Sequence, residues 1–166
     1  MAKGSESSSQ ENPIRYVSAT EDHAEAIHGV LQTTIRAVYP KYYPQAVVDF
    51  FCELHSLDHV REGIASCHMG VAIDDEGNVV GTGCYDGNHI TGVYVLPDFQ
   101  GRRCGTLIID KLEEAIASDH DIACLDASLP AACLYEHRGY KTVGHGVIDL
   151  EDGVKLVYEK MEKRLR

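Results

Sequence analysis

Residues 100–106, Gln-Gly-Arg-Arg-Cys-Gly-Thr, have the types and spacing of an anion-binding turn. The two glycines let the backbone approach a ligand closely, and Arg102 and Arg103 add forked cationic groups that suit phosphate. A β-branched run at 93–96 precedes the turn, and a helical pattern follows it, so the unpaired first N–H groups of that helix lie beside the turn. Strand, turn and helix in this order predict a site for the pyrophosphate of a nucleotide-type cofactor.

Three other patterns are weaker candidates for a ligand site. Gly81-Thr82-Gly83 is similar to a dinucleotide-binding glycine motif, but it lies inside a strand pattern that no helix follows. No GxxxxGK[ST] sequence occurs, which argues against a Walker-type nucleotide site. His55 and His59 have the spacing of metal ligands, yet no third ligand is obvious, and such residues are more often solvated. We therefore expect no metal.

Two motifs together resemble a known family. Residues 95–106 resemble the acyl-CoA signature of the GNAT N-acetyltransferases, usually written Q/R-x-x-G-x-G/A. Residues 125–140, which contain Tyr135 and end in Gly139-Tyr140, resemble the second cofactor motif of that family, and the similarity extends from Ile14 to Tyr158. It implies an acetyl-CoA-dependent N-acetyltransferase that moves an acetyl group to a primary amine, on a small molecule or an exposed amino group, by direct attack on the thioester. A non-catalytic acyl-CoA-binding module on the same fold and a peptide-binding surface built on the aromatic segment are the alternatives.

The resemblance also implies which residues contact the cofactor. They are Val93, Tyr94, Val95, Gln100, Gly101, Arg102, Arg103, Cys104, Gly105, Thr106, Ser128, Ala131 and Tyr135. Two positions depart from the family pattern. Arg103 stands where the first glycine of the signature is usual, which we expect to work only if this position avoids positive φ. Ser128 replaces the Asn of many relatives, and it can cap the next helix, contact the pantetheine arm, or do both.

Two residues are candidates for proton transfer. An alkylammonium has a pKa of ~10.4, about three units above neutral pH, so removing its proton costs roughly 4 to 5 kcal/mol. His89 occupies a position where some GNAT relatives carry a catalytic glutamate, and it can act as the base or merely end a turn. Tyr135 resembles the tyrosine that protonates the departing CoA sulfur, and its alternative role is to pack under the pantetheine arm.

The acceptor site is expected between the connection after the first helix and the closing hairpin, as the resemblance implies. The first side supplies aromatic residues, namely Tyr39, Tyr42, Tyr43, Phe50 and Phe51. The hairpin supplies carboxylates, namely Asp149, Glu151 and Asp152. Aromatic faces and carboxylates favour a cationic amine, although core aromatics and a solvated acidic turn explain the same residues.

Apolar periodicity and turn residues predict the elements that position these groups. Strands are expected at 14–19, 67–73, 79–85, 90–96, 122–127, 140–150 and 154–159. Helices are expected from an N-cap at Thr20 to Val38, from Pro44 to Leu54, from a cap at Ser56 to Ile64, from 107 to about 119, and from Ser128 to Gly139. This order predicts a mixed α/β fold with a mainly antiparallel sheet and a parallel strand pair around the helix that follows the turn at 100–106, which is the expected acyl-CoA site.

Composition limits the class of protein. The chain has 166 residues, which suits a single domain at 13–166 after a polar, disordered arm at 1–12. A net charge of −11 argues against a nucleic-acid partner, and no apolar run approaches the length of a membrane span. Six scattered cysteines without a CxxC pair read as reduced thiols, which points to the cytoplasm. Exposed strand edges make a homodimer possible.

Overall fold

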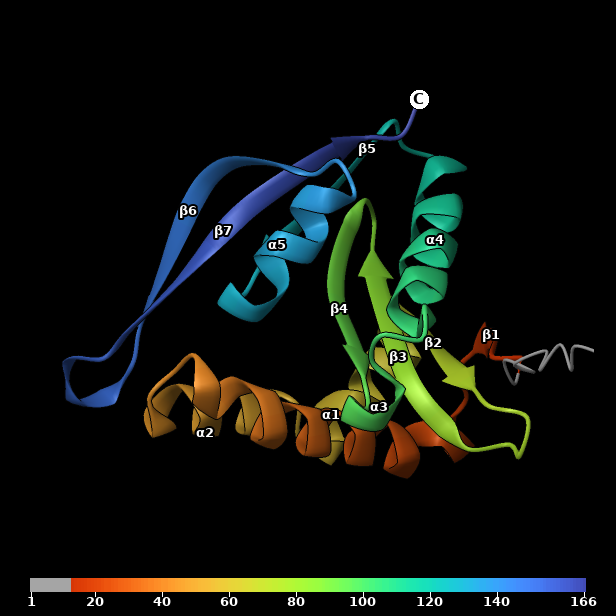
Figure 1. Ribbon diagram of the computed structural model, residues 1–166, viewed down its shortest axis with the longest axis horizontal. Helices are drawn as coiled ribbons and strands as arrows, with labels where there is room; N and C mark the ends of the chain where they lie inside the picture. The colour runs from red at the N-terminus through yellow and green to blue at the C-terminus, as the bar shows by residue number, and fades with distance from the viewer. Residues whose placement is uncertain (1–12) are drawn as a thin grey trace, which may run out of the picture.

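The computed structural model describes residues 13–166, which form a seven-stranded sheet with helices on both faces (Figure 1). The strands are β1 (Arg15–Ser18), β2 (His68–Ile73), β3 (Val79–Asp86), β4 (His89–Val95), β5 (Ile122–Ala127), β6 (Lys141–Asp149) and β7 (Lys155–Arg164). Their order across the sheet is β1-β2-β3-β4-β5-β7-β6, and every neighbouring pair is antiparallel except β4–β5. The predicted mixed, mainly antiparallel sheet is confirmed. The arm predicted at 1–12 lies outside the described residues.

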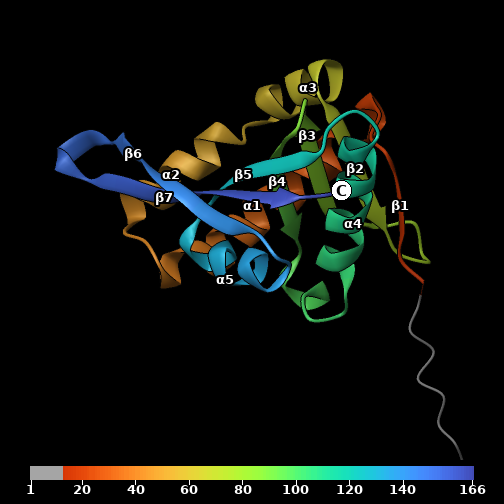
Figure 2. The same ribbon diagram turned by 90° about the horizontal axis from the view of Figure 1, so that it is seen from above.

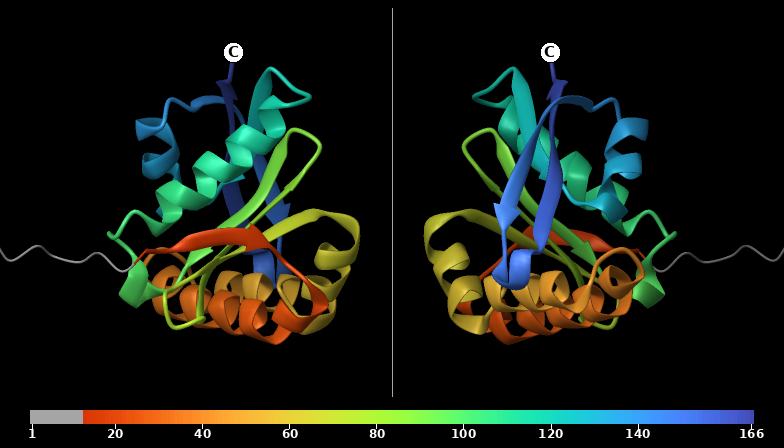
Figure 3. Two further views of the ribbon diagram at one scale, coloured as in Figure 1. Left: turned by 90° about the vertical axis from the view of Figure 1, so that its right-hand side faces the viewer. Right: turned by 90° about the vertical axis from the view of Figure 1, so that its left-hand side faces the viewer.

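Two helical layers enclose the sheet. The helices are α1 (Ala24–Val38), α2 (Gln45–Leu54), α3 (Leu57–Ser66), α4 (Cys104–Ala117) and α5 (Leu129–His137). Val71 and Ile73 of β2 belong to a core with α1–α3, whereas Ala72 between them belongs to a core with α4 and α5, as the alternation of side chains along a strand requires. Figure 3 shows α1–α3 gathered on one side of the strands and α4 on the other. Among the described residues, no helix combines the length and apolar character needed to cross a membrane.

The first helix starts later than its sequence indicates. Thr20 was expected to cap it directly, but a 3₁₀ turn over Glu21–His23 comes first and α1 begins at Ala24. The Thr20 backbone N–H donates to Nδ1 of His23 at 3.0 Å, so the local hydrogen bonding of Thr20 is used in this turn. The cap predicted at Ser56 is confirmed, because its hydroxyl accepts from the N–H of His59 at 3.3 Å.

The last strand ends five residues later than predicted. Its end is predicted at Glu159, but β7 continues through a mostly charged stretch to Arg164. Met161 lies in the middle of this stretch and is fully buried, and the strand pairs with β5 on one side and β6 on the other. A central place in the sheet therefore outweighs the polar composition of the stretch. Figure 2 shows the β6–β7 hairpin projecting beside α2.

Candidate active site

The parallel strands β4 and β5 separate almost at once. They pair only at His89–Cys124 and Ile90–Leu125, after which β4 continues along β3 to Val95 while β5 leads into α5 (Figure 1). Beyond Ile90, the side of β4 that faces β5 therefore has no strand partner. A strand with one open side can pair with an extended ligand as if the ligand were an added strand.

A cavity of about 460 Å³, here the cradle cavity, opens at this separation. Ten of the predicted cofactor residues line it: Val93, Tyr94 and Val95 of β4, Gln100, Gly101 and Arg103 of the turn, Gly105 and Thr106 of α4, and Ser128 and Ala131 at the start of α5. The two sequence motifs, at 95–106 and 125–140, thus meet at one hollow. Ser128 precedes α5, but its side chain makes no capping hydrogen bond, so of its two expected roles only the one toward a ligand is left open.

The side chains of three predicted cofactor residues make contacts within the protein. The guanidinium of Arg102 lies over the ring of Phe99, 5.3 Å from its centroid, and faces a separate hollow on the other side of the turn. Cys104 is buried in the core, where burial raises the pKa of its thiol to about 11. The side chain of Gln100 donates from Nε2 to the Val95 carbonyl at 3.0 Å, so this amide fixes the turn to β4.

The turn before α4 has the backbone geometry of an anion site. Arg103 adopts left-handed backbone with φ of 62°, which corrects the expectation that this position avoids positive φ. Its carbonyl accepts the first helical hydrogen bond, from Leu107 at 3.0 Å, so the N–H groups of residues 104–106 have no acceptor within the helix. A β-carbon added at Gly105 would meet only Val95, at 3.8 Å, which leaves the space before these N–H groups open.

Replacing Arg103 with Gly is expected to stabilise the fold and weaken CoA binding. Left-handed backbone costs a non-glycine residue about 1 kcal/mol, which R103G recovers as free energy of unfolding. Loss of a charge-assisted hydrogen bond is expected to raise the Kd for CoA about tenfold. Urea unfolding and calorimetric titration measure the two effects, with R102A as the control that keeps the wild-type Kd. A larger loss in R102A than in R103G would contradict this assignment.

A second cavity of about 250 Å³, here the aromatic cavity, adjoins the first. Tyr39, Val93, Tyr94, Ser128 and Ala131 line both, so the two hollows meet at the point where β4 and β5 separate. The walls of the aromatic cavity also include Phe50 and Phe51 of α2, Tyr135 of α5, and Ile148, Leu156 and Tyr158 of the β6–β7 hairpin. Its lining is largely aromatic and aliphatic.

Tyr135 lies one helical turn after Ala131 of α5, a residue that lines both cavities. It lines the aromatic cavity, is 6% exposed, and packs edge-on against Tyr140 with ring centroids 5.4 Å apart. Burial, followed by the proximity of Tyr39, raises the pKa of its phenol above the usual value. The hydroxyl therefore keeps its proton near neutral pH and is available as a donor.

His89 lies outside both cavities but next to one of their walls. It begins β4, with Nε2 3.7 Å from an Asp126 carboxylate oxygen and Nδ1 3.3 Å from the Cys124 sulfur. Asp126 itself lines the aromatic cavity. The predicted base thus reaches the cavity through a carboxylate that the sequence reasoning did not single out.

The predicted acceptor residues are only partly brought together. Tyr39 lines both cavities, and the Tyr43 hydroxyl accepts from the Leu129 N–H at 2.7 Å, whereas Tyr42 is 52% exposed and lines neither.

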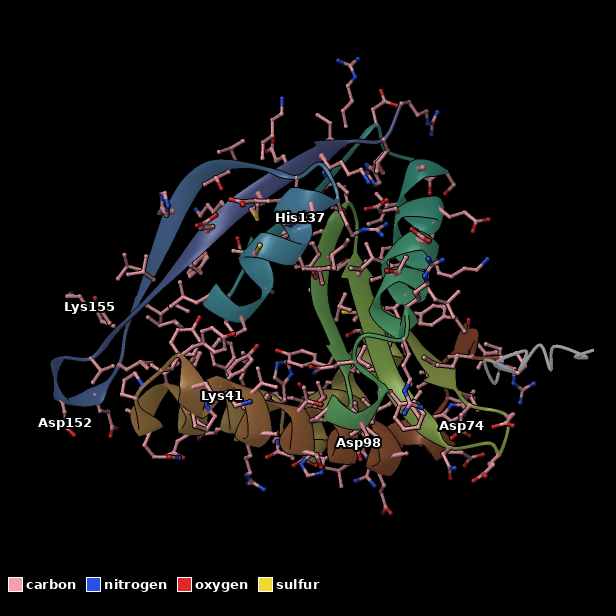
Figure 4. The ribbon with its side chains drawn as sticks, in the orientation of Figure 1. Lys41, Asp74, Asp98, His137, Asp152 and Lys155 are labelled. Carbon is pink, nitrogen blue, oxygen red and sulfur yellow. The ribbon has the colours of Figure 1, made fainter. Side chains whose placement is uncertain are left out.

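The carboxylates of the closing hairpin do not join them. Asp149 pairs with Lys155 at 2.5 Å, and Figure 4 shows Lys155 and Asp152 at the projecting tip. Asp149, Glu151 and Asp152 do not line the aromatic cavity, to which the hairpin contributes Ile148, Leu156 and Tyr158.

His55 is a wall residue that the sequence reasoning misplaced. It was expected to be solvated, yet it lines the aromatic cavity, and its Nε2 lies 3.1 Å from the hydroxyl of the buried Tyr94. The Tyr94 hydroxyl is also 3.4 Å from that of Tyr39, so the three groups form a chain. Burial lowers the pKa of His55 to about 4, which leaves the ring neutral. Within residues 13–166, no three His, Cys, Asp or Glu side chains converge as a metal site.

The partly buried His55 is expected to make the fold sensitive to acid. Its pKa is about 4 when folded and ~6.5 when unfolded, so the unfolded chain binds more protons between these values and stability falls as pH drops through this range. The loss is about 2 kcal/mol between pH 7.5 and pH 5. Urea unfolding at both values measures it. H55Q is expected to lack this part of the pH dependence, whereas H145Q, at an exposed position on β6, keeps it. Equal profiles for H55Q and wild type would refute the assignment.

Comparison with known proteins agrees with this geometry. Residues 38–165 match the family model of the acetyltransferase (GNAT) domain. No curated protein sequence matches the chain significantly.

Solved structures share the fold along nearly the whole chain. A GCN5-related N-acetyltransferase from Rhodopseudomonas palustris is similar with a TM-score of 0.82 and 24% identity, over 92% of this chain and 95% of that one. The PaiA N-acetyltransferase from Thermoplasma acidophilum, solved in complex with coenzyme A, gives a TM-score of 0.70 and 13% identity, over 92% of this chain and 99% of that one. YjaB from Escherichia coli gives a TM-score of 0.68 and 18% identity, over 90% of this chain and 95% of that one. At these identities the structural likeness establishes the fold.

Proposed function

The chain belongs to the GNAT acetyltransferase family, and from this premise we propose that it transfers the acetyl group of acetyl-CoA to a primary amine. The observation that supports this most directly is the pair of adjoining cavities where β4 and β5 separate. One cavity contains the turn before α4, the other has a largely aromatic wall, and Tyr135 belongs to that wall one helical turn from the shared residue Ala131. A donor and an acceptor can then meet without water between them.

The cradle cavity fits the proposed donor. The open N–H groups at the start of α4 and the guanidinium of Arg103 would hold the pyrophosphate, and the free side of β4 at Val93 and Tyr94 would pair with the pantetheine amides. The Val95 carbonyl already accepts from Gln100 and from Thr34, so we assign it no role with the cofactor. PaiA, which shares the fold, is known in complex with coenzyme A, and this supports the assignment.

Each residue then has a role in proton transfer. Acetyl-CoA supplies a thioester, whose carbonyl carbon the amine nitrogen attacks as the carbon–sulfur bond breaks. Tyr135 donates its phenolic proton to the departing sulfur. Asp126 holds the ammonium group, and the ammonium proton passes by way of this carboxylate to His89. The nitrogen loses a second proton as the amide forms, and this proton restores the phenol of Tyr135. The products are an amide, a thiol and the one proton that leaves His89 for solvent.

Replacing His89 with Gln is expected to lower kcat/KM about tenfold or more at pH 7. The difference in kcat/KM between H89Q and wild type is expected to become smaller as pH rises toward the amine pKa of ~10.4, because the free amine then needs no base. A pH profile of the acetylation rate measures this, and H137Q, on the exposed side of α5, is the matched control (Figure 4). If H89Q follows the wild-type profile throughout, the base is another group.

Release of the CoA thiol in the presence of an amine tests whether the protein is an N-acetyltransferase. Purified protein is incubated with acetyl-CoA and a panel of primary amines, free CoA is titrated with a thiol reagent, and the acetylated amine is identified by mass. At least one amine is expected to yield equal amounts of both products. CoA binding without turnover on any amine would instead support the non-catalytic binding module.

A further inference from the structure

We propose that the acceptor is a small amine with one positive charge and an apolar body, bound with its ammonium at Asp126 and its body against the β6–β7 hairpin. This rests on the proposed function and narrows it to a substrate class. Three features of the aromatic cavity carry the inference: its charge, its direction and its size.

The aromatic cavity offers one carboxylate to a ligand. Asp126 is the only Asp, Glu, Lys or Arg among the described residues that line it. The lone histidine of the wall, His55, is kept neutral by burial. Lys160 lies opposite Asp126 on β7, but within residues 13–166 it forms no ion pair with that carboxylate, and it does not line the cavity. His89 faces this carboxylate at 3.7 Å from outside the cavity, so the wall itself offers a ligand one anionic group, which selects one cation.

Apolar residues lie beyond the carboxylate in one direction. Asp126 pairs with residue 160 of β7, and Tyr158 and Leu156 follow on the same face of that strand toward the hairpin tip, at about 7 Å and 14 Å by the rise of a strand. The ring of Tyr158 lies across Gly146, where an added β-carbon would be 2.0 Å from it. Ile148, opposite Leu156, completes this end of the wall from the hairpin.

The end of α2 closes the same part of the cavity. Phe50 and Phe51 pack edge-on at 5.5 Å, and Leu54, the last residue of the helix, lines the wall although its side chain is 45% exposed. The cavity holds about 250 Å³, at the small end of ligand sites, which suits a compact amine rather than a folded protein surface. The apolar side chains at this end provide no ionic or hydrogen-bonding partner for a second charge at the far end of the ligand.

Three amines of equal length isolate this property. Hexylamine, 1,6-diaminohexane and 6-aminohexanoate carry the same reacting amine and differ only at the far end, which is a methyl, an ammonium or a carboxylate group. With acetyl-CoA saturating, kcat/KM for hexylamine is expected to exceed that of the other two at least tenfold. The diamine counts as two reacting ends when the rates are compared.

Two variants test the two ends of the site separately. D126N is expected to lower kcat/KM for hexylamine at least tenfold while the Kd for CoA is unchanged, and D149N, which removes a carboxylate outside the cavity, is the matched control with wild-type rates. L54E places a carboxylate at the apolar end on an exposed position, and is expected to raise the rate of the diamine relative to hexylamine about tenfold.

The outcomes separate this inference from the proposed function. Equal or faster acetylation of the diamine or the amino acid by the wild-type protein overturns the inference and leaves the N-acetyltransferase in place. The same holds if D126N and D149N behave alike. If none of the amines, nor any in the wider panel, releases CoA, both the inference and the proposed function are overturned.

Discussion

Replacing Tyr135 with Phe is expected to lower kcat about 100-fold and to leave the KM for acetyl-CoA within about twofold. The ring remains, so packing against Tyr140 is preserved, and only the proton donor to the departing sulfur is lost. Burial raises the pKa of this phenol, so the donor form predominates at neutral pH and the effect is expected across the working range. Steady-state CoA release with a saturating amine measures it.

Tyr140 provides the matched control for this substitution. Its hydroxyl donates to Glu113 Oε1 at 3.0 Å, and it does not line the aromatic cavity, although its ring touches that of Tyr135. Y140F is expected to lower the free energy of unfolding by about 1 kcal/mol without changing kcat. A Y135F enzyme with wild-type kcat would show that Tyr135 only packs beside the pantetheine arm.

Replacing Gly105 with Leu is expected to act on stability and on binding in opposite directions. Gly105 lies in the first turn of α4, where glycine costs about 1 kcal/mol relative to a good helix former, so G105L is expected to raise the free energy of unfolding by up to that amount. The new side chain occupies the open space of the cradle cavity, and the Kd for CoA is expected to rise at least 100-fold. Chemical unfolding and calorimetric titration of the same sample measure both effects.

An exposed glycine in another helix isolates the helix-forming part of the effect. Gly29 lies in α1, and a β-carbon there would meet nothing within 4 Å. G29L is expected to stabilise the fold to a similar degree and leave the Kd for CoA unchanged. If G105L still binds CoA as tightly as the wild type, the pyrophosphate does not lie against the start of α4.

The fold and the cradle were predictable because their signals are local. Gln100–Thr106 follows a strand pattern and precedes a helical one, so backbone geometry alone brings the turn, the strand end and the helix start together. The later motif ends in Gly139, whose positive φ terminates α5 as its sequence indicates. Even here the backbone of Arg103 was predicted wrongly, since no sequence pattern reports that a non-glycine residue has been forced into left-handed geometry.

The acceptor side was less predictable because it depends on contacts between distant segments. Asp126 and His89 meet only through the short parallel ladder of β4 and β5, and no spacing in the sequence marks them as a pair. His55 was considered with His59 for metal binding, but its burial depends on where α2 lies over Tyr94. One signal was available: alternation along β7 places Leu156 and Tyr158 on one face, and this apolar pair pointed inward.

The short ladder between β4 and β5 also divides the molecule mechanically. Only two rungs, near Ile90 and Leu125, join the strands β1–β4 to β5, β7 and β6, and α4 is the main packing element that spans both parts. The sheet therefore consists of two groups of strands joined by the β4–β5 pair. Separating this pair breaks far fewer hydrogen bonds than separating any other strand pair in the centre of the sheet. A ligand bound in the two cavities contacts both groups of strands at once. Its binding therefore stabilises the folded state against separation of β4 from β5 and makes unfolding of the two groups more cooperative.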